Sequence, residues 1–476
     1  MINDSTERKL PCSMENADTY LHANRFDIII KIVYMYFHVV IKQIPQCILL
    51  SYTEHLRVWN GFKEYCDDKD PRMNDYYKSC KPKNTAEDFL TSYHNLIENL
   101  RNYGFNPSKS SIPVDVNGFL LNGAHRLASS IVLSQPVCIQ HLSYNNVLTY
   151  DYKFFHRRGL QKRVIEMVVL EYLKIQLHLN LTSQVSILSL FSKNEDKEKN
   201  MRSILLNKCS RDGFIVYEKD VVITKLGMKQ LIIHMYGLQS WTKAKINNMK
   251  NKFSKSDLAR VRFFFFFGRS NTELKHCKNE IRMLYNDSNF KSSAHIPDTP
   301  HENLILAEMI LNNSSLQLIN NGKHTDTCLN IVTEISKNSF LSPINTLPGL
   351  YKSRQDIMLD SGIVLDFFGI RKGTDVDVLF LSNVDKAILG KFNGVQYQAH
   401  AFASNVVEDT RPWGEDHLSK NKTKWDLFYN PDNYGFCYGI KFVSLLQITR
   451  YKSKRKEPIK DDYDIKLIQS FMKTVV

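Results

Sequence analysis

The segment Arg371-Lys-Gly-Thr-Asp-Val-Asp-Val-Leu-Phe-Leu381 carries two carboxylates, Asp375 and Asp377, at the start of an apolar run. Alternate side chains of a β-strand point to the same face, so a strand here would set both carboxylates side by side. Carboxylate oxygens suit a hard cation such as Mg²⁺. The segment therefore predicts a strand with a metal site at its beginning.

A polar turn and a short helix are expected just before this strand. Asp360-Ser-Gly362 is a small polar turn, and the apolar residues 363–369 follow it as a short helix. Turn, helix, basic loop and Asp-x-Asp strand together resemble the core of the nucleotidyltransferase superfamily. This resemblance implies that the two aspartates hold Mg²⁺, and that Ser361 and Gly362 face the phosphates of a nucleoside triphosphate substrate.

The chain departs from the family pattern in two respects. The family usually has Gly-Ser or Gly-Gly where this chain has Ser361-Gly362, and it usually supplies a third carboxylate from a later strand. The next strand-like run, 395–402, carries no acid. Either Glu408 or Asp409 substitutes, or the metal site is incomplete and the domain is inactive. An Asp-x-Asp pair on a solvated strand edge is the plainer alternative.

The C-terminal end of the chain extends the resemblance. A basic cluster is followed by the pattern Lys-Asp-x-x-Asp on an expected helix, which looks like the tail of several nucleotidyltransferase families. By this resemblance Lys460, Asp461 and Asp464 brace the domain, while Lys441 or Arg455 reaches a phosphate. The alternative for the basic cluster is an exposed charged loop.

A second informative segment covers residues 112–131. A strand ends at Asn117-Gly118, a pair favoured in tight hairpin turns, and a returning strand leads to a helix that begins at about Ala124. The unpaired backbone N–H groups of a helix start attract anions, and an arginine there adds a bidentate phosphate donor. The plainer interpretation is an ordinary helix start with a solvated arginine.

This order of elements, with Gly-Ala-His-Arg at the strand-to-helix junction, resembles the ParB and sulfiredoxin fold. Members of that fold bind nucleotide phosphates at the junction. The resemblance implies that Gly123, His125 and Arg126 bind phosphate and that Asp115 and Asn122 line the same pocket. The fold hosts several reactions, so it does not select one.

Residues 293–302 admit two interpretations. Asp298 or Thr299 is a good N-cap residue, Pro300 suits the first helical position, and Glu302 follows three residues after Thr299. Capping chemistry explains this pattern without any function. The same ten residues also offer a metal or acid–base cluster. That cluster would consist of His295, Asp298, His301 and Glu302.

The whole chain is expected to be a multidomain α/β protein, α+β in parts. At 476 residues it is long enough for several cores. The apolar run 260–268 predicts a strand covered on both faces. The expected parts are a helical segment at 1–84, a ParB/sulfiredoxin-like module at 85–190, a middle α/β region at 201–320 and a nucleotidyltransferase-like mixed sheet with helices at 321–476.

Composition bears on the partners of the protein and on its cellular compartment. A formal charge of +14 favours anionic partners, and its spread along the chain argues against a dedicated DNA-binding tail. Nine cysteines without a Cys-x-x-Cys pair suit reduced thiols in the cytoplasm. Residues 26–41 are apolar, but Asp27, Lys31 and His38 interrupt them, so they predict a buried or amphipathic helix instead of a transmembrane segment.

The resulting hypothesis is a Mg²⁺-dependent nucleotidyl- or phosphotransferase that acts on a small phosphorylated or polyol acceptor. A resemblance to proteins of surface-polysaccharide loci suggests that biosynthetic setting. One rival is a glycosyltransferase that uses a nucleotide sugar; its Asp-x-Asp usually closes an apolar strand, whereas here the apolar run 378–381 follows the acids. The other rival is a non-catalytic, ParB-like nucleotide- or nucleic-acid-binding protein. A DNA-binding protein of that type is expected to have a helix-turn-helix just after the ParB-like module.

Overall fold

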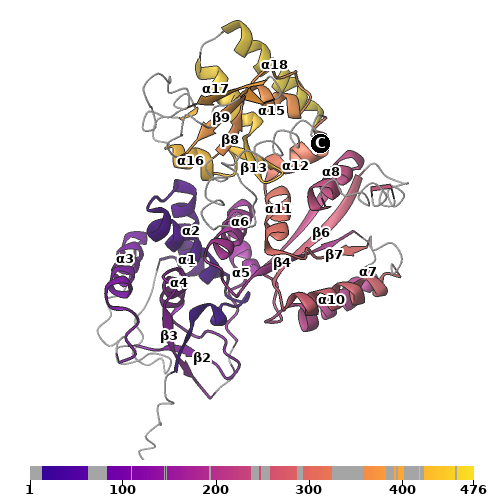
Figure 1. Ribbon diagram of the computed structural model, residues 1–476. Helices are drawn as coiled ribbons and strands as arrows, with labels where there is room; N and C mark the ends of the chain where they lie inside the picture. The colour runs from indigo at the N-terminus through magenta and orange to yellow at the C-terminus, as the bar shows by residue number, and fades with distance from the viewer. Residues whose placement is uncertain are drawn as a thin grey trace, which may run out of the picture.

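The protein was analysed as a computed structural model. The structure describes residues 13–62, 83–108, 110–143, 145, 147–191, 195–236, 246–247, 258–286, 293–323, 357–381, 391–392, 395–400, 417–418, 423–455 and 458–475. Within these ranges the chain is mixed α/β, as expected, and its strands form three separate sheets. The three sheets lie in three regions of the molecule, with the C-terminal sheet at the top of Figure 1, the N-terminal sheet at the lower left and the middle sheet at the right.

The N-terminal region surrounds a small sheet with strand order β1-β3-β2. β1 pairs with β3 antiparallel, and β2 pairs with β3 parallel. Residues 13–16 therefore belong to the sheet of the module that was expected to begin at residue 85. The elements are β1 (Ser13–Asn16), η1 (Ala17–Tyr20), α1 (Phe26–Tyr36), η2 (Phe37–Ile41), α2 (Gln46–Asn60), α3 (Ala86–Tyr103), β2 (Ile112–Val114), α4 (Ala124–Val132), β3 (Pro136–His141), α5 (Tyr152–Arg157) and α6 (Lys162–His178).

Helix α1 is buried, as the interrupted apolar pattern predicted. Its two charged residues neutralise each other, because the Lys31 ammonium lies 2.7 Å from the Asp27 carboxylate, which also accepts from Arg25 at 2.9 Å. Buried charges are tolerated when they are paired in this way. Among the described helices, none is long and apolar enough to cross a membrane.

The middle region is an antiparallel sheet with strand order β5-β6-β4-β7. The phenylalanines of β6 explain its central position, since all five from Phe263 to Phe267 are fully buried and alternate between two cores. Burial on both faces was predicted, and the structure adds that the neighbouring strands run antiparallel. The elements are β4 (Val185–Leu190), α7 (Glu195–Ile204), η4 (Leu205–Cys209), β5 (Tyr217–Thr224), α8 (Lys225–Tyr236), β6 (Leu258–Phe267), α10 (Asn271–Leu284), β7 (Ala294–His295), α11 (Pro300–Ile310) and α12 (Asn313–Asn321).

Two expectations change in this region. β4 pairs with β6 and β7, so residues 185–190 belong to the middle sheet and not to the preceding module. The structure also brings Cys209 of η4 and Cys277 of α10 together, with Cα atoms 5.8 Å apart, a separation that permits a disulfide. All nine cysteines were expected to be reduced, and no pairing of these two was expected. Their spacing of 68 residues gave no sequence signal.

The C-terminal region contains a mixed sheet with strand order β10-β11-β9-β8-β13-β12. β8 is antiparallel to β9 and parallel to β13, and β11 is parallel to β9. The elements are β8 (Ile357–Asp360), α15 (Gly362–Phe367), β9 (Val376–Phe380), β10 (Lys391–Phe392), β11 (Val395–His400), α16 (Lys424–Tyr429), β12 (Tyr434–Cys437), β13 (Ile440–Val443), α17 (Leu445–Arg455) and α18 (Pro458–Thr474).

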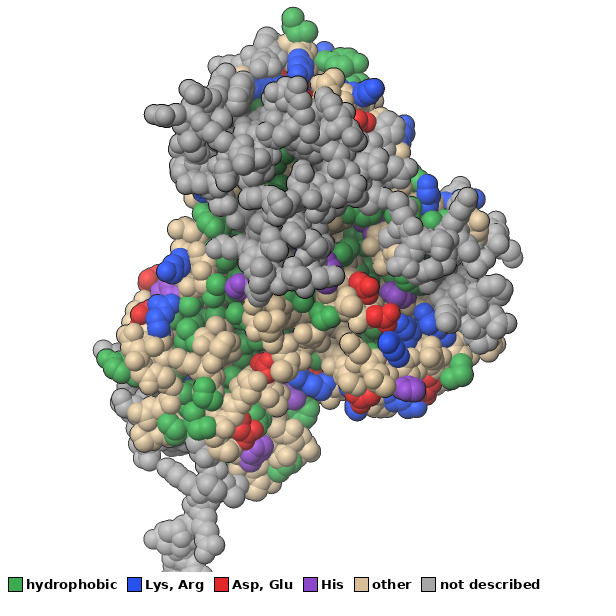
Figure 2. Space-filling model, in the orientation of Figure 1, with side chains coloured by type: hydrophobic (Ala, Val, Ile, Leu, Met, Phe, Trp, Pro, Cys, Tyr) green, Lys and Arg blue, Asp and Glu red, His purple; other side chains and the backbone are tan. Residues whose placement is uncertain are grey.

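One apolar core runs through all three regions. Helix α6 packs against α1 on one side and α11 on the other, and α12 packs on β12, so the middle helices join the N-terminal and C-terminal parts. On the face in Figure 2, Lys and Arg side chains lie among Asp and Glu side chains instead of gathering in one basic patch. Such mixing agrees with the even spread of charge along the sequence.

Candidate functional site: the aspartate pair of the C-terminal sheet

The turn, short helix and strand predicted around the aspartates are present, and a strand that was not predicted, β8, precedes the turn. β8 ends at Asp360, the chain turns at Ser361, α15 runs from Gly362 to Phe367, and β9 begins at Val376. All four residues of β8 and all five of β9 are buried, which fixes both strands in the centre of the sheet. The turn and the start of β9 are thus held by core packing on either side.

The two aspartates lie where the chain enters β9. Asp375 is partly exposed just before the strand, and Asp377, the second residue of β9, is buried. Asp377 stands opposite Asp360 in the antiparallel register between β9 and β8. Directly opposed residues of neighbouring strands share a face of the sheet, so Asp360 is a further carboxylate next to the predicted metal pair.

The loop before β9 folds back over the start of α15. A Cβ atom built on Gly362 would lie 3.6 Å from both Asp375 Oδ1 and Arg371 Nη1, so the carboxylate and the guanidinium converge above this glycine. A Cβ atom on Gly373 would lie 3.1 Å from the Gly362 carbonyl oxygen. The close approach of two glycines therefore brings the basic loop, the acid pair and the turn together.

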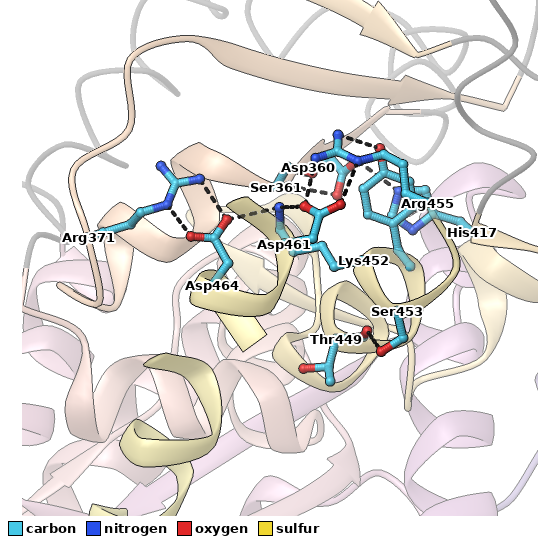
Figure 3. Close-up of polar contacts among 11 residues, drawn as sticks. Asp360, Ser361, Arg371, His417, Thr449, Lys452, Ser453, Arg455, Asp461 and Asp464 are labelled. Atoms are coloured by element: carbon cyan, nitrogen blue, oxygen red, sulfur yellow. Dashed lines mark hydrogen bonds and ion pairs between the residues drawn. The ribbon is translucent and has the colours of Figure 1, made fainter. Parts of the chain in front are cut away.

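A chain of ion pairs anchors Arg371 to the C-terminal helices (Figure 3). The Arg371 guanidinium makes two hydrogen bonds to Asp464 of α18, at 2.6 and 2.9 Å. Lys452 of α17 lies 2.9 Å from both Asp464 and Asp461, and Asp461 also accepts from Arg455 at 2.7 Å. Asp461 and Asp464 thus link α18 to α17 and to the loop before β9, which agrees with the bracing role predicted for them, and the Arg455 side chain takes part in the same ion pairs.

The electrostatics of the brace follow from burial and pairing. Burial raises the pKa of Asp464, but hydrogen bonds from Arg371 and Lys452 outweigh burial and hold its pKa below the ordinary aspartate value. The bond to Asp464 in turn raises the pKa of Arg371, and the negative charges of Asp375 and Asp377 raise it further. Arg371 therefore lies in the electrostatic field of both the brace and the metal pair.

Lys441 does not lie beside this site. It is fully buried on β13, its ammonium donates to the Phe428 carbonyl at 2.7 Å, and the Tyr429 and Tyr434 rings lie within 5 Å of it. The prediction that Lys441 reaches a phosphate is not supported by this placement. Lys460, by contrast, is exposed on α18.

The turn residue Ser361 has an unusual backbone conformation. Its φ of 52° lies in the region that favours glycine, with ψ at −117°. Its hydroxyl oxygen is buried and has no hydrogen-bond partner among the described residues. Strain and an unsatisfied hydroxyl each destabilise a fold and persist mainly where function needs them.

Ser361→Gly is therefore expected to stabilise the protein by about 1 kcal/mol, since glycine adopts this φ without strain and removes the hydroxyl. Ser361→Ala is the matched control, because it removes the hydroxyl and keeps the strain. The midpoint of thermal unfolding measures both. A Ser361→Gly protein less stable than Ser361→Ala would show that the turn is not strained.

His417 is part of the site and was not predicted. Its Nε2 lies 2.8 Å from Asp360 Oδ2, and its ring stacks on Tyr451 with centroids 4.0 Å apart. Both side chains of the His417–Asp360 pair are fully buried. No sequence pattern connects residues 57 positions apart, so only the fold reveals this contact.

A third carboxylate from a later strand is not found at the expected register. Gln398 of β11 pairs with Asp377, and the two alternatives, Glu408 and Asp409, lie outside the described residues. Across the described part of the chain, no group of three or more His, Cys, Asp or Glu residues is arranged to hold a metal ion. Asp375 and Asp377 both lie near Arg371, and such a pair fits Mg²⁺, which commonly uses one or two protein carboxylates and completes its shell with substrate phosphates and water.

At the junction predicted to bind phosphate in the N-terminal region, the helix begins where it was expected, but β2 ends at Val114 and the returning strand is only an isolated bridge between Leu120 and Val114. Gly123 is the N-cap of α4 with φ 89°, and no side chain caps the helix. The Asn122 side chain accepts from the Gly123 N–H at 2.6 Å. Arg126 donates to the Ser111 carbonyl at 2.8 Å, and its guanidinium lies 3.0 Å from where a Cβ on Gly123 would be. The arginine thus lies against the glycine at the helix start.

His125 and Asp115 have structural contacts at the same junction. His125 Nε2 lies 2.9 Å from the Tyr52 hydroxyl, and burial, together with Lys31 and Lys83, holds its pKa well below the usual value. His125 is therefore neutral at pH 7 and adds no positive charge. Asp115 is fully buried and accepts from two N–H groups of the hairpin turn, at Asn117 and Phe119.

If Arg126 holds a phosphate here, Arg126→Ala is expected to weaken nucleotide binding by roughly tenfold to a hundredfold, because a charge-assisted hydrogen bond is lost. Isothermal titration calorimetry with nucleoside triphosphates measures the Kd. Arg101→Ala, at an exposed position on α3, serves as the control. Unchanged affinity in Arg126→Ala would leave this junction with a structural role alone.

Residues 293–302 include the N-terminal cap of helix α11. Thr299 and Glu302 form a capping box at the start of α11, with Pro300 at the first helical position, as that interpretation predicted. Asp298 pairs with Lys278 at 2.8 Å, and His295 is buried on β7 with its ring against Tyr236. His301 is partly buried on α11. Capping thus accounts for Glu302, and the ion pair with Lys278 accounts for Asp298, the two acids of the alternative cluster.

Comparison with protein-family models, with curated protein sequences and with solved structures finds no match to this chain. Functional inference therefore rests on the residues and their geometry.

Proposed function

We propose that the C-terminal region is a Mg²⁺-dependent nucleotidyltransferase. In this proposal the enzyme transfers a nucleotidyl group from a nucleoside triphosphate to a small acceptor. The observation that carries the proposal is the convergence of the Asp375 carboxylate and the Arg371 guanidinium over Gly362, beside Asp377 on β9. Acidic groups for a cation and a basic group for phosphate thus meet at one turn.

The roles of the side chains follow from their chemistry. Asp375 and Asp377 would hold the ion, which when bound neutralises phosphate charge and polarises the phosphorus–oxygen bonds. The Ser361 hydroxyl has no partner among the described residues, so it can donate to a phosphate oxygen without breaking an existing bond. Arg371 supplies fixed positive charge, and the two hydrogen bonds that it donates to Asp464 keep it oriented before substrate arrives.

The acceptor in this proposal is a small phosphorylated or polyol molecule. A net charge of +14 favours anionic ligands, and the interspersed charges in Figure 2 do not form a continuous basic track for nucleic acid. The position of the acids also bears on the glycosyltransferase alternative. Asp375 precedes β9 and the apolar residues 378–380 follow it, whereas the glycosyltransferase motif usually closes its strand.

A thermal-shift panel tests the proposal against its rivals, since a ligand that binds the folded state raises the unfolding midpoint by mass action. The panel contains nucleoside triphosphates, nucleotide sugars and duplex DNA, each with and without Mg²⁺. We expect stabilisation by a triphosphate that depends on Mg²⁺. Stabilisation by nucleotide sugars alone would favour a glycosyltransferase, and stabilisation by DNA alone would favour a nucleic-acid-binding protein.

A further inference from the structure

Asp360 holds the turn that leads into α15. One oxygen of its buried carboxylate accepts from the Ser361 N–H at 2.7 Å, and the other accepts from His417 at 2.8 Å. The first bond is made within one residue, across the point where φ becomes positive. Asp360 therefore contacts the strained turn directly and connects it to a residue distant in sequence.

His417 is itself fixed from two sides. Its ring lies flat on Tyr451 of α17, with an interplanar angle of 7°, and its carbonyl accepts from the Gln447 side chain of the same helix at 2.7 Å. Figure 3 shows His417 and Asp360 beside Arg455 and the ion pairs of α17 and α18. The ring is thus attached to the same helix that carries Lys452 of the brace.

The hydrogen bond between His417 and Asp360 also affects the electrostatics of the site. Asp360 stands opposite Asp377 in the strand register, and like charges at directly opposed positions repel each other. The hydrogen bond from His417 stabilises the carboxylate of Asp360 on the side away from the Ser361 N–H. Asp360 can therefore remain beside Asp377 while its carboxylate accepts the hydrogen bond from the Ser361 N–H.

We infer that His417, acting through Asp360, is a positioning residue that holds Ser361 and Gly362 in the conformation that receives the nucleotide phosphates. This inference rests on the proposed function and extends it to a residue that no motif marks. His417 contacts neither substrate nor metal in this account. Its effect is transmitted by the two hydrogen bonds of one buried carboxylate.

Two substitutions in the full chain separate the hydrogen bond from the ring. His417→Phe keeps a ring that can stack on Tyr451 and removes the donor to Asp360. His417→Gln loses the ring and keeps an amide that can donate. The readouts are the Kd for a nucleoside triphosphate with Mg²⁺, measured by calorimetry, and the midpoint of thermal unfolding. Asp462→Asn, at an exposed position on α18, is the control.

We expect His417→Phe to weaken triphosphate binding about tenfold, and His417→Gln to bind within about threefold of the unsubstituted protein even if it unfolds earlier. A purely structural role would make binding follow stability in both variants. That result, or unchanged binding in His417→Phe, overturns the inference.

Failure of the inference about His417 can be distinguished from failure of the proposed function. If the unsubstituted protein binds the triphosphate with Mg²⁺ and loses binding in Asp375→Asn, the function stands whatever His417 does. If the unsubstituted protein shows no Mg²⁺-dependent binding, both the function and the inference are overturned.

Discussion

Joint replacement of Asp375 and Asp377 by asparagine is expected to lower the rate of Mg²⁺-dependent nucleotidyl transfer by a factor on the order of 10³ or more. Each 1.4 kcal/mol of lost transition-state stabilisation costs about tenfold in rate, and a bound metal contributes several kcal/mol. Asparagine keeps the size of each side chain and removes the negative charge. Release of pyrophosphate from a nucleoside triphosphate, with a panel of candidate acceptors, measures the rate.

The matched control for this change is Asp462→Asn, which removes a carboxylate from an exposed position of α18 in the same region. It should retain the full rate. Thermal unfolding of the double variant establishes that it remains folded. Full activity in a folded Asp375→Asn/Asp377→Asn protein would show that the pair does not hold a catalytic metal.

The largest expected effect on stability comes from Asp464→Ala. Asp464 accepts two hydrogen bonds from Arg371 and lies 2.9 Å from the buried ammonium of Lys452. Its removal leaves the partly buried Arg371 guanidinium without its carboxylate partner and leaves Lys452 paired with Asp461 alone, at a cost of roughly 3 kcal/mol. Hydrogen exchange of the β8 and β9 amides reports this loss, because the opening free energy of these strands depends on the brace.

The pH dependence of this loss has a definite sign. The pKa of Asp464 is lower in the folded protein than in an unfolded chain, because its bonds to Arg371 and Lys452 outweigh burial. The stability it contributes is therefore fully present above the ordinary aspartate pKa of about 3.9 and is lost as the pH falls through the lower folded value. The difference between Asp464→Ala and the unsubstituted protein should shrink over that acidic range.

Asp462→Ala again provides a neighbouring comparison, since its side chain is exposed and should change stability by less than about 0.5 kcal/mol. If Asp464→Ala left exchange of the β8 and β9 amides unchanged, the ion pairs drawn in Figure 3 would contribute nothing to holding the sheet and helices together.

Local features of the fold were predictable because they depend on neighbouring residues. The Asp-x-Asp strand, the turn at Asn117-Gly118 and the helix start at Ala124 each follow from a short pattern, and the structure has all three. The capping box of Thr299 and Glu302 is another case. In the turn, the helix start and the capping box the deciding contacts lie within four residues of one another, whereas β9 also pairs with β8 and β11.

Contacts between distant segments were not predictable from these patterns. Lys441, which was expected to reach a phosphate, is instead enclosed by aromatic rings because β13 lies inside the sheet. The contact of Cys209 with Cys277 and the hydrogen bond from His417 to Asp360 each join residues more than fifty positions apart. Single-sequence patterns contain no information on such pairings, so the brace was expected only through a family resemblance.

Calorimetric titration of a nucleoside triphosphate analogue with a non-hydrolysable α–β bridge, in the presence and absence of Mg²⁺, tests the central claim most directly. The account predicts binding that requires Mg²⁺ in the unsubstituted protein and is lost in Asp375→Asn/Asp377→Asn. Equal binding by both proteins, or binding that is indifferent to Mg²⁺, would contradict it.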